Sequence, residues 1–262
     1  MKSLREYGEK PFRVAVVHGG PGAPGEVGPV ARELSQICGV LEPFQSADSI
    51  DGQIEELKGI LLEKTDSPIT LVGYSWGAWL SYIFAVRYPK LIKKLILVGC
   101  GSFEEEYLTS MNADRTSRLT EEENRRVGEI MSLLNGPNNE NRKEVFKEFG
   151  KLMSKADSFA PISLEGDILD FQPEVFEKCM SEIRPLRKNK ELLNMGKDIQ
   201  CPVVAIHGEY DSHNFQGVEK PLSKVIKDFR FILLKDCGHS PWNEVYAKKE
   251  FYTILNQEIS SI

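Results

Sequence analysis

A serine stands between two glycines in the stretch Gly73-Tyr74-Ser75-Trp76-Gly77, directly after a run of apolar residues. Where a strand turns at once into a helix, the central residue is forced into a strained conformation, and small flanking residues let the chain double back closely. The hydroxyl of Ser75 would then be exposed at a helix N-terminus, where developing negative charge is favoured. The same pattern also suits a serine that caps the helix. Taken alone, it leaves a nucleophile and a helix cap equally open.

A serine nucleophile needs a base to accept its proton and an acid to orient that base. The chain has four histidines, at positions 18, 207, 213 and 239. His239 lies in KDCGHSPWNE, between the last expected strand and the last expected helix, and Asp211 lies in HGEYDSHNF, just past the preceding strand. Loops that follow parallel strands open on the same edge of a sheet. The order Ser75, Asp211, His239 is therefore that of a complete Ser-His-Asp triad.

A glycine-rich segment follows the first strong strand and consists of His18, Gly19, Gly20, Pro21 and Gly22. Such a loop can direct a backbone N–H group towards a developing oxyanion. We expect the donors to be the N–H groups of Gly20 and of Trp76, the residue after the serine. Phosphate binding is the alternative for a loop of this composition, but the G-x-x-x-x-G-K-[ST] pattern is absent. The segment therefore predicts an oxyanion hole.

Five runs of apolar and β-branched residues predict strands that are buried on both faces, as is typical of a parallel sheet. They cover residues 13–19, 69–75, 94–100, 202–208 and 230–236, and a weaker run covers 40–46, where Pro43 removes a ladder donor. Helical patterns separate these runs, and residues 76–88 are apolar on nearly every side, as in a helix packed against a sheet. The alternation predicts an α/β fold with a mostly parallel sheet of about six strands and helices on both faces.

This alternation breaks between about residues 102 and 199. The stretch has no convincing strand, but Thr120 and Glu123 form a capping box before one helical stripe and Pro173 begins another. We therefore divide the chain into a core of residues 1–101 and 200–262 and an all-helical insertion of residues 102–199. An insertion at this point would sit over the carboxyl ends of the strands, where open parallel sheets bind ligands.

The composition excludes several classes of protein. Of the 262 residues, 41% are hydrophobic and 27% charged, which is ordinary for a globular protein. The formal charge is −6 and no block of Lys or Arg stands out, so we expect no nucleic-acid partner. Five scattered cysteines without a CxxC pair argue against a disulfide framework and a zinc site. No signal peptide and no apolar run of about 20 residues is visible, so we expect a cytoplasmic protein without a membrane segment; its oligomeric state stays open.

HGGPG at residues 18–22 and GYSWGA at residues 73–78 together resemble the prolyl iminopeptidase branch of the α/β-hydrolase-fold serine hydrolases and its esterase-like relatives. The resemblance covers about residues 12–101 and 200–260. It implies the following roles: nucleophile Ser75, base His239, acid Asp211, and oxyanion donors Gly20 and Trp76. It also implies that the helical insertion is a lid.

Two departures from that family stand out. The family usually begins with an antiparallel pair of strands, whereas only about a dozen residues precede the first strong strand here, which predicts a sheet shortened to six strands. Prolyl iminopeptidases usually carry an Arg-Gly turn after the second parallel strand, whereas this chain reads EPFQSADS at residues 42–49. The second departure weakens the assignment to the aminopeptidases and leaves the triad untouched.

A metal site is a competing hypothesis for the segment H-x-E-x-D-x-H, which comprises His207, Glu209, Asp211 and His213. On a strand, this alternation would place all four side chains on one face. The segment should leave the sheet at Gly208, however, which breaks the two-residue period. We therefore expect no metal and no other cofactor. We expect His18 and His207 to be structural, each before a turn glycine, and His213 to line the pocket mouth or face solvent.

Two further residues are candidates for the substrate pocket. Glu104 begins a run of three glutamates after a strand and could hold a substrate amine or serve as a reserve triad acid, although such a run is more often a solvated helix start. Trp242 could pack behind His239 or edge the pocket. Trp79 and its apolar neighbours are expected to be helix packing.

Our first hypothesis is a serine hydrolase that cleaves an ester or amide of a small molecule through an acyl-enzyme. An aminopeptidase that acts on N-terminal proline is the second. A cofactor-free lyase on the same scaffold is a further possibility. A non-enzymatic receptor that retains the fold and pocket represents another class, and it is disfavoured because every part of the triad is present.

Overall fold

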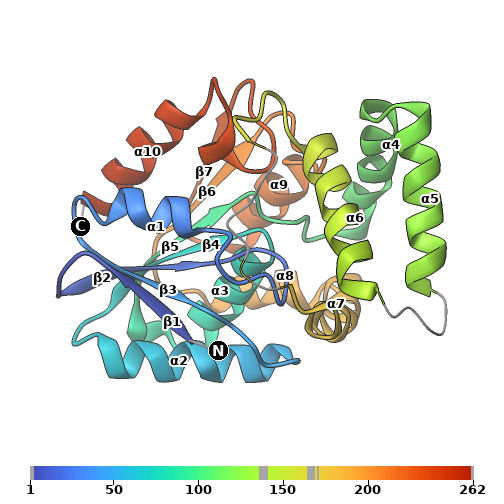
Figure 1. The fold of residues 1–262 in the computed structure, drawn as a ribbon. Helices are drawn as coiled ribbons and strands as arrows, with labels where there is room; N and C mark the ends of the chain where they lie inside the picture. Colours follow the sequence, from blue (N-terminus) through green and yellow to red (C-terminus); the bar gives the residue numbers. More distant parts are fainter. Residues whose placement is uncertain (1–2, 136–140, 164–168, 170, 261–262) are drawn as a thin grey trace.

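The computed structural model describes residues 3–135, 141–163, 169 and 171–260, which form a seven-stranded sheet with helices on both faces (Figure 1). The strands are β1 (Leu4–Tyr7), β2 (Phe12–Val17), β3 (Gly39–Pro43), β4 (Ile69–Tyr74), β5 (Ile92–Val98), β6 (Val203–Gly208) and β7 (Phe229–Leu234). Their order in the sheet is β1-β3-β2-β4-β5-β6-β7, and all pairs are parallel except β1 with β3. The predicted α/β class is confirmed.

The sheet has one strand more than the six we expected, namely the antiparallel edge strand β1. Its sequence, LREY, has two charged residues in the middle and is only half-buried, so it lacks the continuous apolar run of the other strands. Pairing with β3 holds it in place, and the hydroxyl of Tyr7 donates to Glu42 at 2.7 Å. The weak strand around Pro43 does form, with the proline as its last residue.

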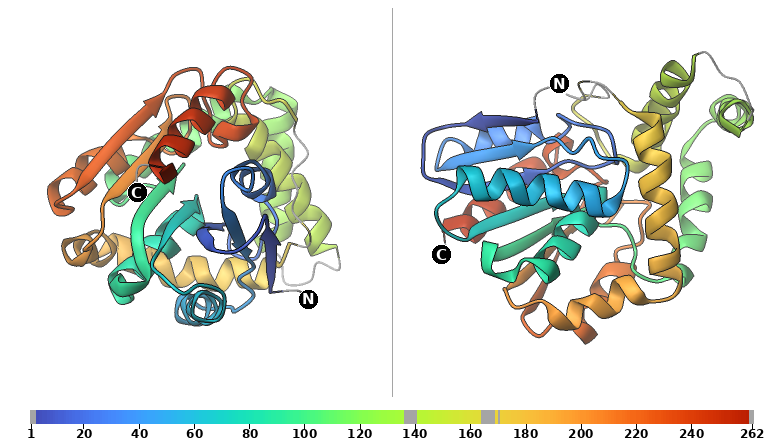
Figure 2. Two further views of the ribbon diagram at one scale, coloured as in Figure 1. Left: turned by 90° about the vertical axis from the view of Figure 1, so that its left-hand side faces the viewer. Right: turned by 90° about the horizontal axis from the view of Figure 1, so that it is seen from below.

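Both faces of the sheet are covered because successive residues of its strands point to opposite sides. One face packs against α1 (Gly28–Leu34) and α10 (Lys248–Ser260), and the other against α2 (Ile50–Lys64), α3 (Trp76–Arg87) and α9 (Gln216–Val225). Figure 2 (left) shows α10, in red, and α2, in light blue, on opposite sides of the sheet. The central strands are therefore mostly apolar, as the sequence predicts, with a few polar residues such as Thr70 in β4 and Lys94 in β5.

The segment between β5 and β6 is helical in its described part. It contains α4 (Thr109–Arg118), α5 (Glu121–Asn135), α6 (Arg142–Asp157), α7 (Pro173–Lys188) and the short α8 (Glu191–Asn194). Helices α4, α5 and α6 stand together at one end of the sheet (Figure 1), while α7 packs against α2. The predicted capping box forms: the N–H of Thr120 donates to Glu123 at 2.9 Å, and the N–H of Glu123 donates to the Thr120 hydroxyl at 3.2 Å.

The helices can also be compared with the length and composition of membrane-spanning segments. Within the part of the chain that the structure describes, none of them combines the length and apolar composition needed to span a bilayer.

Candidate active site

Ser75 lies at the sharp turn between β4 and α3, with backbone angles of φ 53° and ψ −115°. A non-glycine residue in such a sparsely populated region costs about 1–3 kcal/mol, so its surroundings must hold it there. Its N–H donates to the carbonyl oxygen of Val98 in β5 at 2.9 Å. A Cβ atom on Gly73 would collide with the carbonyl oxygen of Gly77, and one on Gly77 with that of His18. The two glycines are therefore steric requirements of the turn.

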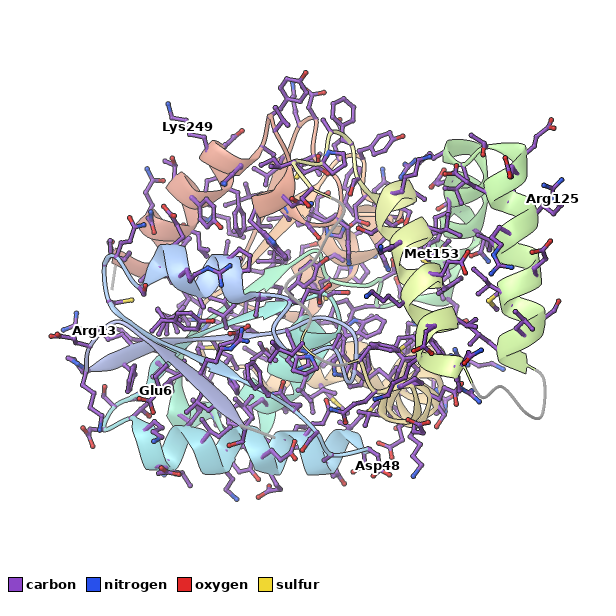
Figure 3. All side chains as sticks on the ribbon, viewed as in Figure 1. Glu6, Arg13, Asp48, Arg125, Met153 and Lys249 are labelled. Atoms are coloured by element: carbon purple, nitrogen blue, oxygen red, sulfur yellow. The ribbon has the colours of Figure 1, made fainter. Side chains whose placement is uncertain are left out.

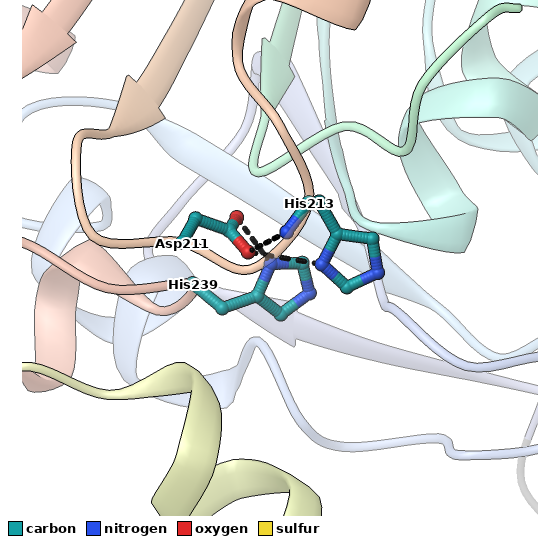
Figure 4. A group of neighbouring side chains, drawn as sticks. All are labelled: Asp211, His213 and His239. Atoms are coloured by element: carbon teal, nitrogen blue, oxygen red, sulfur yellow. Dashed lines mark hydrogen bonds and ion pairs between the residues drawn. The ribbon is translucent and has the colours of Figure 1, made fainter. Parts of the chain in front are cut away.

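The side chain of Ser75 does not cap α3. Instead, its Oγ lies 3.0 Å from Nε2 of His239, and Nδ1 of the same ring lies 2.6 Å from Oδ2 of Asp211. Figure 4 shows Asp211 and His239 side by side on their two loops. The three predicted residues thus form one chain of hydrogen bonds with the geometry of a Ser-His-Asp triad.

Burial and neighbouring charges determine the protonation of this triad. The side chain of Asp211 has no exposed surface. Burial works to raise the pKa of Asp211, but the charges of three neighbouring histidines outweigh it and hold that pKa well below its usual value. Burial works to lower the pKa of His239, but the Asp211 carboxylate overcomes it and raises that pKa. His239 is therefore a stronger base than a free histidine.

The loop that contains Gly20 and the helix that begins with Trp76 meet near the serine turn. The carbonyl oxygens of Val17 and His18 lie against Gly77 in the first turn of α3, so the HGGPG loop begins beside the serine. Gly20 has a positive φ of 42° and accepts a hydrogen bond from the N–H of Ala23 at 2.9 Å. Trp76 is the first residue of α3, where backbone N–H groups have no intrahelical partner.

His18 ties this loop to the segment after β3. It is fully buried, its Nδ1 lies 2.7 Å from the carbonyl oxygen of Gly19, and its Nε2 accepts the N–H of Gln45 at 3.4 Å. Burial lowers the pKa of His18 to about 4, so the ring is neutral near pH 7. The position is that of a structural histidine.

The same loop contains the spacing G-x-G-x-x-G at residues 20–25, a pattern that also occurs in dinucleotide-binding loops. In those proteins the pattern opens a helix, whereas α1 begins here only at Gly28. The N–H of Gln172, before α7, donates to the carbonyl oxygen of Gly22 at 2.9 Å, and a Cβ on Gly22 would press on Gln172. The surroundings of the loop therefore differ from those of a dinucleotide site.

Glu26 is a titratable group near this loop that the sequence did not suggest. Its Oε2 lies 2.6 Å from where a Cβ on Gly19 would be, and this oxygen is buried without a hydrogen-bond partner among the described residues. Burial raises the pKa of Glu26 to about 7, although the charge of His239 opposes the change. An acid in a glycine- and proline-rich loop carries no sequence signal of burial.

A second histidine also binds the triad acid. Nδ1 of His213 lies 2.9 Å from Oδ1 of Asp211, and its ring stacks on that of His239 with centroids 4.5 Å apart and planes 22° apart (Figure 4). Nε2 of His207 lies 3.2 Å from Oδ2 of Asp211 and 2.7 Å from the carbonyl oxygen of His213. We expected His213 at the pocket mouth or in solvent; its side chain is only 20% exposed, so it is not freely solvated.

The residue types around Asp211 are also those that bind metals. The possible ligand atoms of Asp211, His213 and His239 all lie within 4.8 Å of one another, and two imidazoles with one carboxylate are ligands that zinc accepts. Within the group, Nδ1 of each of the two rings already binds a carboxylate oxygen of Asp211. Glu209, part of the alternating set in the sequence, is exposed and lies outside the group. The arrangement is thus a triad with an additional histidine.

Asp157, the last residue of α6, joins the helical segment to the triad. Its backbone carbonyl accepts the N–H of His239 at 2.8 Å. Its buried carboxylate accepts the hydroxyl of Ser212 at 2.5 Å and two nitrogens of Arg115, on α4, at 2.8 and 2.6 Å. Burial works to raise the pKa of Asp157, but Arg115 outweighs it and the pKa is lowered. The α6 end therefore supports both loops that carry triad residues.

Glu244 makes a second connection of the same kind. Its buried carboxylate accepts three backbone N–H groups, from Gly238 at 3.0 Å, Phe159 at 2.9 Å and Ala160 at 2.7 Å. The segment after α6 is thereby bound to the loop that carries His239. Both Asp157 and Glu244 act through contacts between residues far apart in the chain, so no local pattern reveals them.

The two pocket candidates, Glu104 and Trp242, both contact other side chains of the protein. The carboxylate of Glu104 binds Nζ of Lys190 at 2.9 Å, so it is not the acid that orients His239. Trp242 is buried and packs edge-on against Tyr74 with ring centroids 4.5 Å apart. Tyr74 in turn lies 5.0 Å from the ring of His239. Trp242 thus packs behind the histidine, which is one of the two places we expected.

These observations define a class of protein. A mostly parallel sheet is covered on both faces, a serine occupies the strand–helix turn after β4, and the Asp211 and His239 side chains that form a hydrogen-bonded chain with it follow β6 and β7. This is the architecture of the α/β-hydrolase fold. Residues 43–242 match the alpha/beta hydrolase fold family, and the chain belongs to that family.

Several known proteins are similar to this chain. Ethanol acetyltransferase 1 of Cyberlindnera fabianii is 21% identical over 220 residues, which are 82% of this chain but only 60% of that protein. VinJ has 17% identity and a TM-score of 0.68, with 98% of this chain and 94% of VinJ covered. MenH from S. aureus has 20% identity and a TM-score of 0.67, with 100% and 99% covered. Est816, an N-acyl homoserine lactone degrading enzyme, has 17% identity and a TM-score of 0.64, with 97% and 95% covered. At these identities, the solved structures demonstrate a shared fold.

Proposed function

We propose that this protein is a serine hydrolase that cleaves an ester or amide bond of a small molecule through an acyl-enzyme. The observation that carries the proposal is the continuous hydrogen-bonded chain from Ser75 Oγ to His239 and from His239 to Asp211, at 3.0 and 2.6 Å. The raised pKa of His239 and the lowered pKa of Asp211 suit a base and the charged partner that stabilises it.

In the proposed reaction, Ser75 Oγ attacks the substrate carbonyl carbon while Nε2 of His239 takes the hydroxyl proton. Asp211 stabilises the resulting imidazolium through Nδ1–H. The N–H groups of Gly20 and Trp76 stabilise the oxyanion, and a donor of this kind contributes about 10²–10³-fold to the rate. His239 then protonates the leaving alcohol or amine. Finally, a water molecule gives a proton to His239 and attacks the acyl carbon, which releases the acid and restores Ser75.

We favour esters over N-terminal proline amides as substrates. An aminopeptidase needs an acid that is free to hold the substrate amine, and our candidate Glu104 binds Lys190 instead. The similar proteins include an ethanol acetyltransferase and an N-acyl homoserine lactone degrading enzyme; acetylation of ethanol forms an ester, and a lactone is a cyclic ester. An iminopeptidase-like activity stays the second candidate on account of the HGGPG and GYSWGA motifs.

We further propose that the helical segment of residues 102–199 acts as the lid over this site. Two parts of the segment contact the loops of the proposed site: Asp157 bonds to His239 and Ser212, and Gln172 bonds to Gly22, which supports this role. A substrate that packs against these helices would meet the triad directly.

The test is turnover of a substrate panel by the wild-type protein and by Ser75→Ala. The panel contains p-nitrophenyl esters of increasing acyl length and the p-nitroanilide of proline. We expect ester turnover that the substitution abolishes and little release from the prolyl anilide. Turnover of the anilide alone would favour the aminopeptidase. Saturable binding of a small molecule without turnover would instead support a receptor, and elimination without hydrolysis would support a lyase.

A further inference from the structure

Besides His207, whose Nε2 lies 3.2 Å from Oδ2, the carboxylate of Asp211 binds the rings of His239 and His213 through different oxygens. Oδ2 accepts from Nδ1 of His239 at 2.6 Å, as a triad requires, and Oδ1 accepts from Nδ1 of His213 at 2.9 Å. The two rings lie nearly parallel, 4.5 Å apart (Figure 4). Oδ1 also accepts the backbone N–H of His213 at 2.9 Å, which a residue of almost any type could provide. The ring therefore adds a second donor and a flat surface against His239.

The ring of His213 is itself held in place. The backbone next to the ring is fixed on both sides. The backbone carbonyl oxygen of His213 lies 2.7 Å from Nε2 of the buried His207, and the hydroxyl of the preceding Ser212 donates to Asp157 at 2.5 Å. The side chain of His213 is 20% exposed and that of His239 14%. Both rings thus lie in a largely enclosed space in which rotation of one would displace the other.

We propose that His213 is a positioning residue of the triad, acting through Asp211 and His239. Its Nδ1–H holds Oδ1 so that Oδ2 faces His239, and its ring limits rotation of the His239 ring so that Nε2 points at Ser75. This role rests on the proposed hydrolase function and goes beyond the three triad residues.

The arrangement also requires His213 to be neutral when His239 accepts the serine proton, because two stacked imidazolium rings repel. The charged and titratable groups around the pair are Asp211, Asp157, Arg115, His207, Glu26 and Tyr74. Burial lowers the pKa of His213 although Asp211 opposes the change, whereas the pKa of His239 is raised. As the pH falls, the first proton therefore goes to His239, which is the order that the reaction needs.

Three substitutions separate the two contributions of the ring. His213→Phe keeps a stacked ring and loses the donor, so the Asp211 charge acts more fully on His239. We expect the His239 pKa, and with it the acidic limb of kcat, to rise by about 0.5–1 pH unit. His213→Asn keeps a donor near the Nδ1 position and loses the ring, so we expect an unchanged limb and a kcat reduced by about 3–10-fold. His213→Ala loses both, and we expect kcat to fall by about 10–100-fold with KM nearly unchanged.

The experiment combines kcat–pH profiles with an NMR titration of the imidazole 15N signals, which are few because the chain has four histidines. The NMR titration measures the His239 pKa and tautomer in the intact protein whether or not it turns over a substrate. The exposed Lys249→Ala serves as the control for folding and stability. Shifted His239 signals and pKa in His213→Phe support the proposal. A His239 pKa and tautomer identical to wild type in both His213→Phe and His213→Ala would overturn it, while absent turnover in the wild type would count against the hydrolase function alone.

Discussion

The sheet that carries the triad and the helices beside it differ in how tightly their residues are constrained. Strand β4 is buried along its whole length, and so is α3 from Trp76 to Ala85. Helix α4, by contrast, has no buried residue, and Arg125 on α5 points away from the protein (Figure 3). A side chain beside the serine has no room to change, whereas many of those on α4 and α5 have room. The proposed triad therefore lies where packing determines the geometry.

The charged contacts show the same difference. Within the helical segment, ion pairs such as Arg126–Glu148 and Lys155–Glu123 are exposed to solvent. Where the segment meets the triad loops, the pair Arg115–Asp157 is largely buried, with 17% and 6% of the two side chains exposed. Exposed pairs contribute little to stability, whereas breaking a buried pair leaves an uncompensated charge. The boundary between the regions should thus behave like the core.

The largest effect is expected at the triad acid. In Asp211→Asn the amide cannot accept the Nδ1–H of His239 with the same charge, so the ring loses the tautomer and partner that make it a base. We expect kcat to fall by about 10⁴-fold with KM nearly unchanged. Stopped-flow or steady-state kinetics with the best ester substrate of the panel measures kcat and KM. A loss smaller than tenfold would place the acid elsewhere.

The next effect concerns the serine turn. A Cβ atom in Gly77→Ala would collide with the carbonyl oxygens of Val17 and His18, so we expect a loss of about 2–4 kcal/mol in the free energy of unfolding. Gly128→Ala is the matched control, because a Cβ there meets nothing within 4 Å. In helix α5 it should stabilise the protein by up to about 1 kcal/mol. Urea unfolding measures the free energy of unfolding of both variants. Equal changes in the two would contradict the steric role of Gly77.

The boundary between the regions is tested by Asp157→Asn. The change removes the charge that binds Arg115 and weakens the acceptor of Ser212, while the backbone bond to His239 is kept. We expect a loss of about 1–3 kcal/mol in stability and of about tenfold in kcat. The double variant Arg115→Ala with Asp157→Asn should lose less than the two single variants summed. Strict additivity would mean that the two residues do not act together.

The pH profile gives a smaller but sharper effect. His239 must be neutral to accept the serine proton, and its pKa is raised above the ordinary value of 6.5 by Asp211. Activity should therefore be lost as the pH falls through a value above 6.5. Glu26 titrates near 7, so the profile is measured in wild type and in Glu26→Gln. If the loss of activity at low pH persists in Glu26→Gln, it reports the protonation of His239. If it vanishes, it reports the protonation of Glu26.

The smallest effect is expected at an exposed ion pair. Arg126 on α5 binds Glu148 on α6 with both side chains about two-fifths exposed. Arg126→Ala should leave Tm within about 1 °C of the wild type and kcat unchanged. Differential scanning calorimetry and the ester assay measure both. A decrease in Tm and kcat as large as that of Asp157→Asn would contradict the proposed difference between exposed and buried ion pairs.

The sequence predicted the parts of the protein whose signals are local. The strands around Ser75 are continuous apolar runs, and the capping box of Thr120 and Glu123 is a four-residue pattern, so both could be recognised and both form. Strand β1 was missed because LREY resembles a polar loop until β3 lies beside it. Asp211 and His239 each follow a predicted parallel strand, and this was sufficient to predict that they meet at one edge of the sheet.

Contacts between distant segments left no such signal. Asp157 and Glu244 are ordinary acids in sequence and become buried acceptors only when α6 meets the loop of His239. His213 belonged to an alternating set that indicated metal ligands or solvent, and its stacking on His239 depends on two loops 26 residues apart, from position 213 to position 239. Such roles need the folded arrangement.

The central claim is that Ser75 is a nucleophile activated by His239 and Asp211. The most direct measurement is mass spectrometry of the protein after reaction with a fluorophosphonate, which phosphonylates activated serines. We predict a single adduct in the wild type, located on the peptide that contains Ser75, and none in Ser75→Ala. An unlabelled wild type, or an adduct that persists in Ser75→Ala, would contradict the claim.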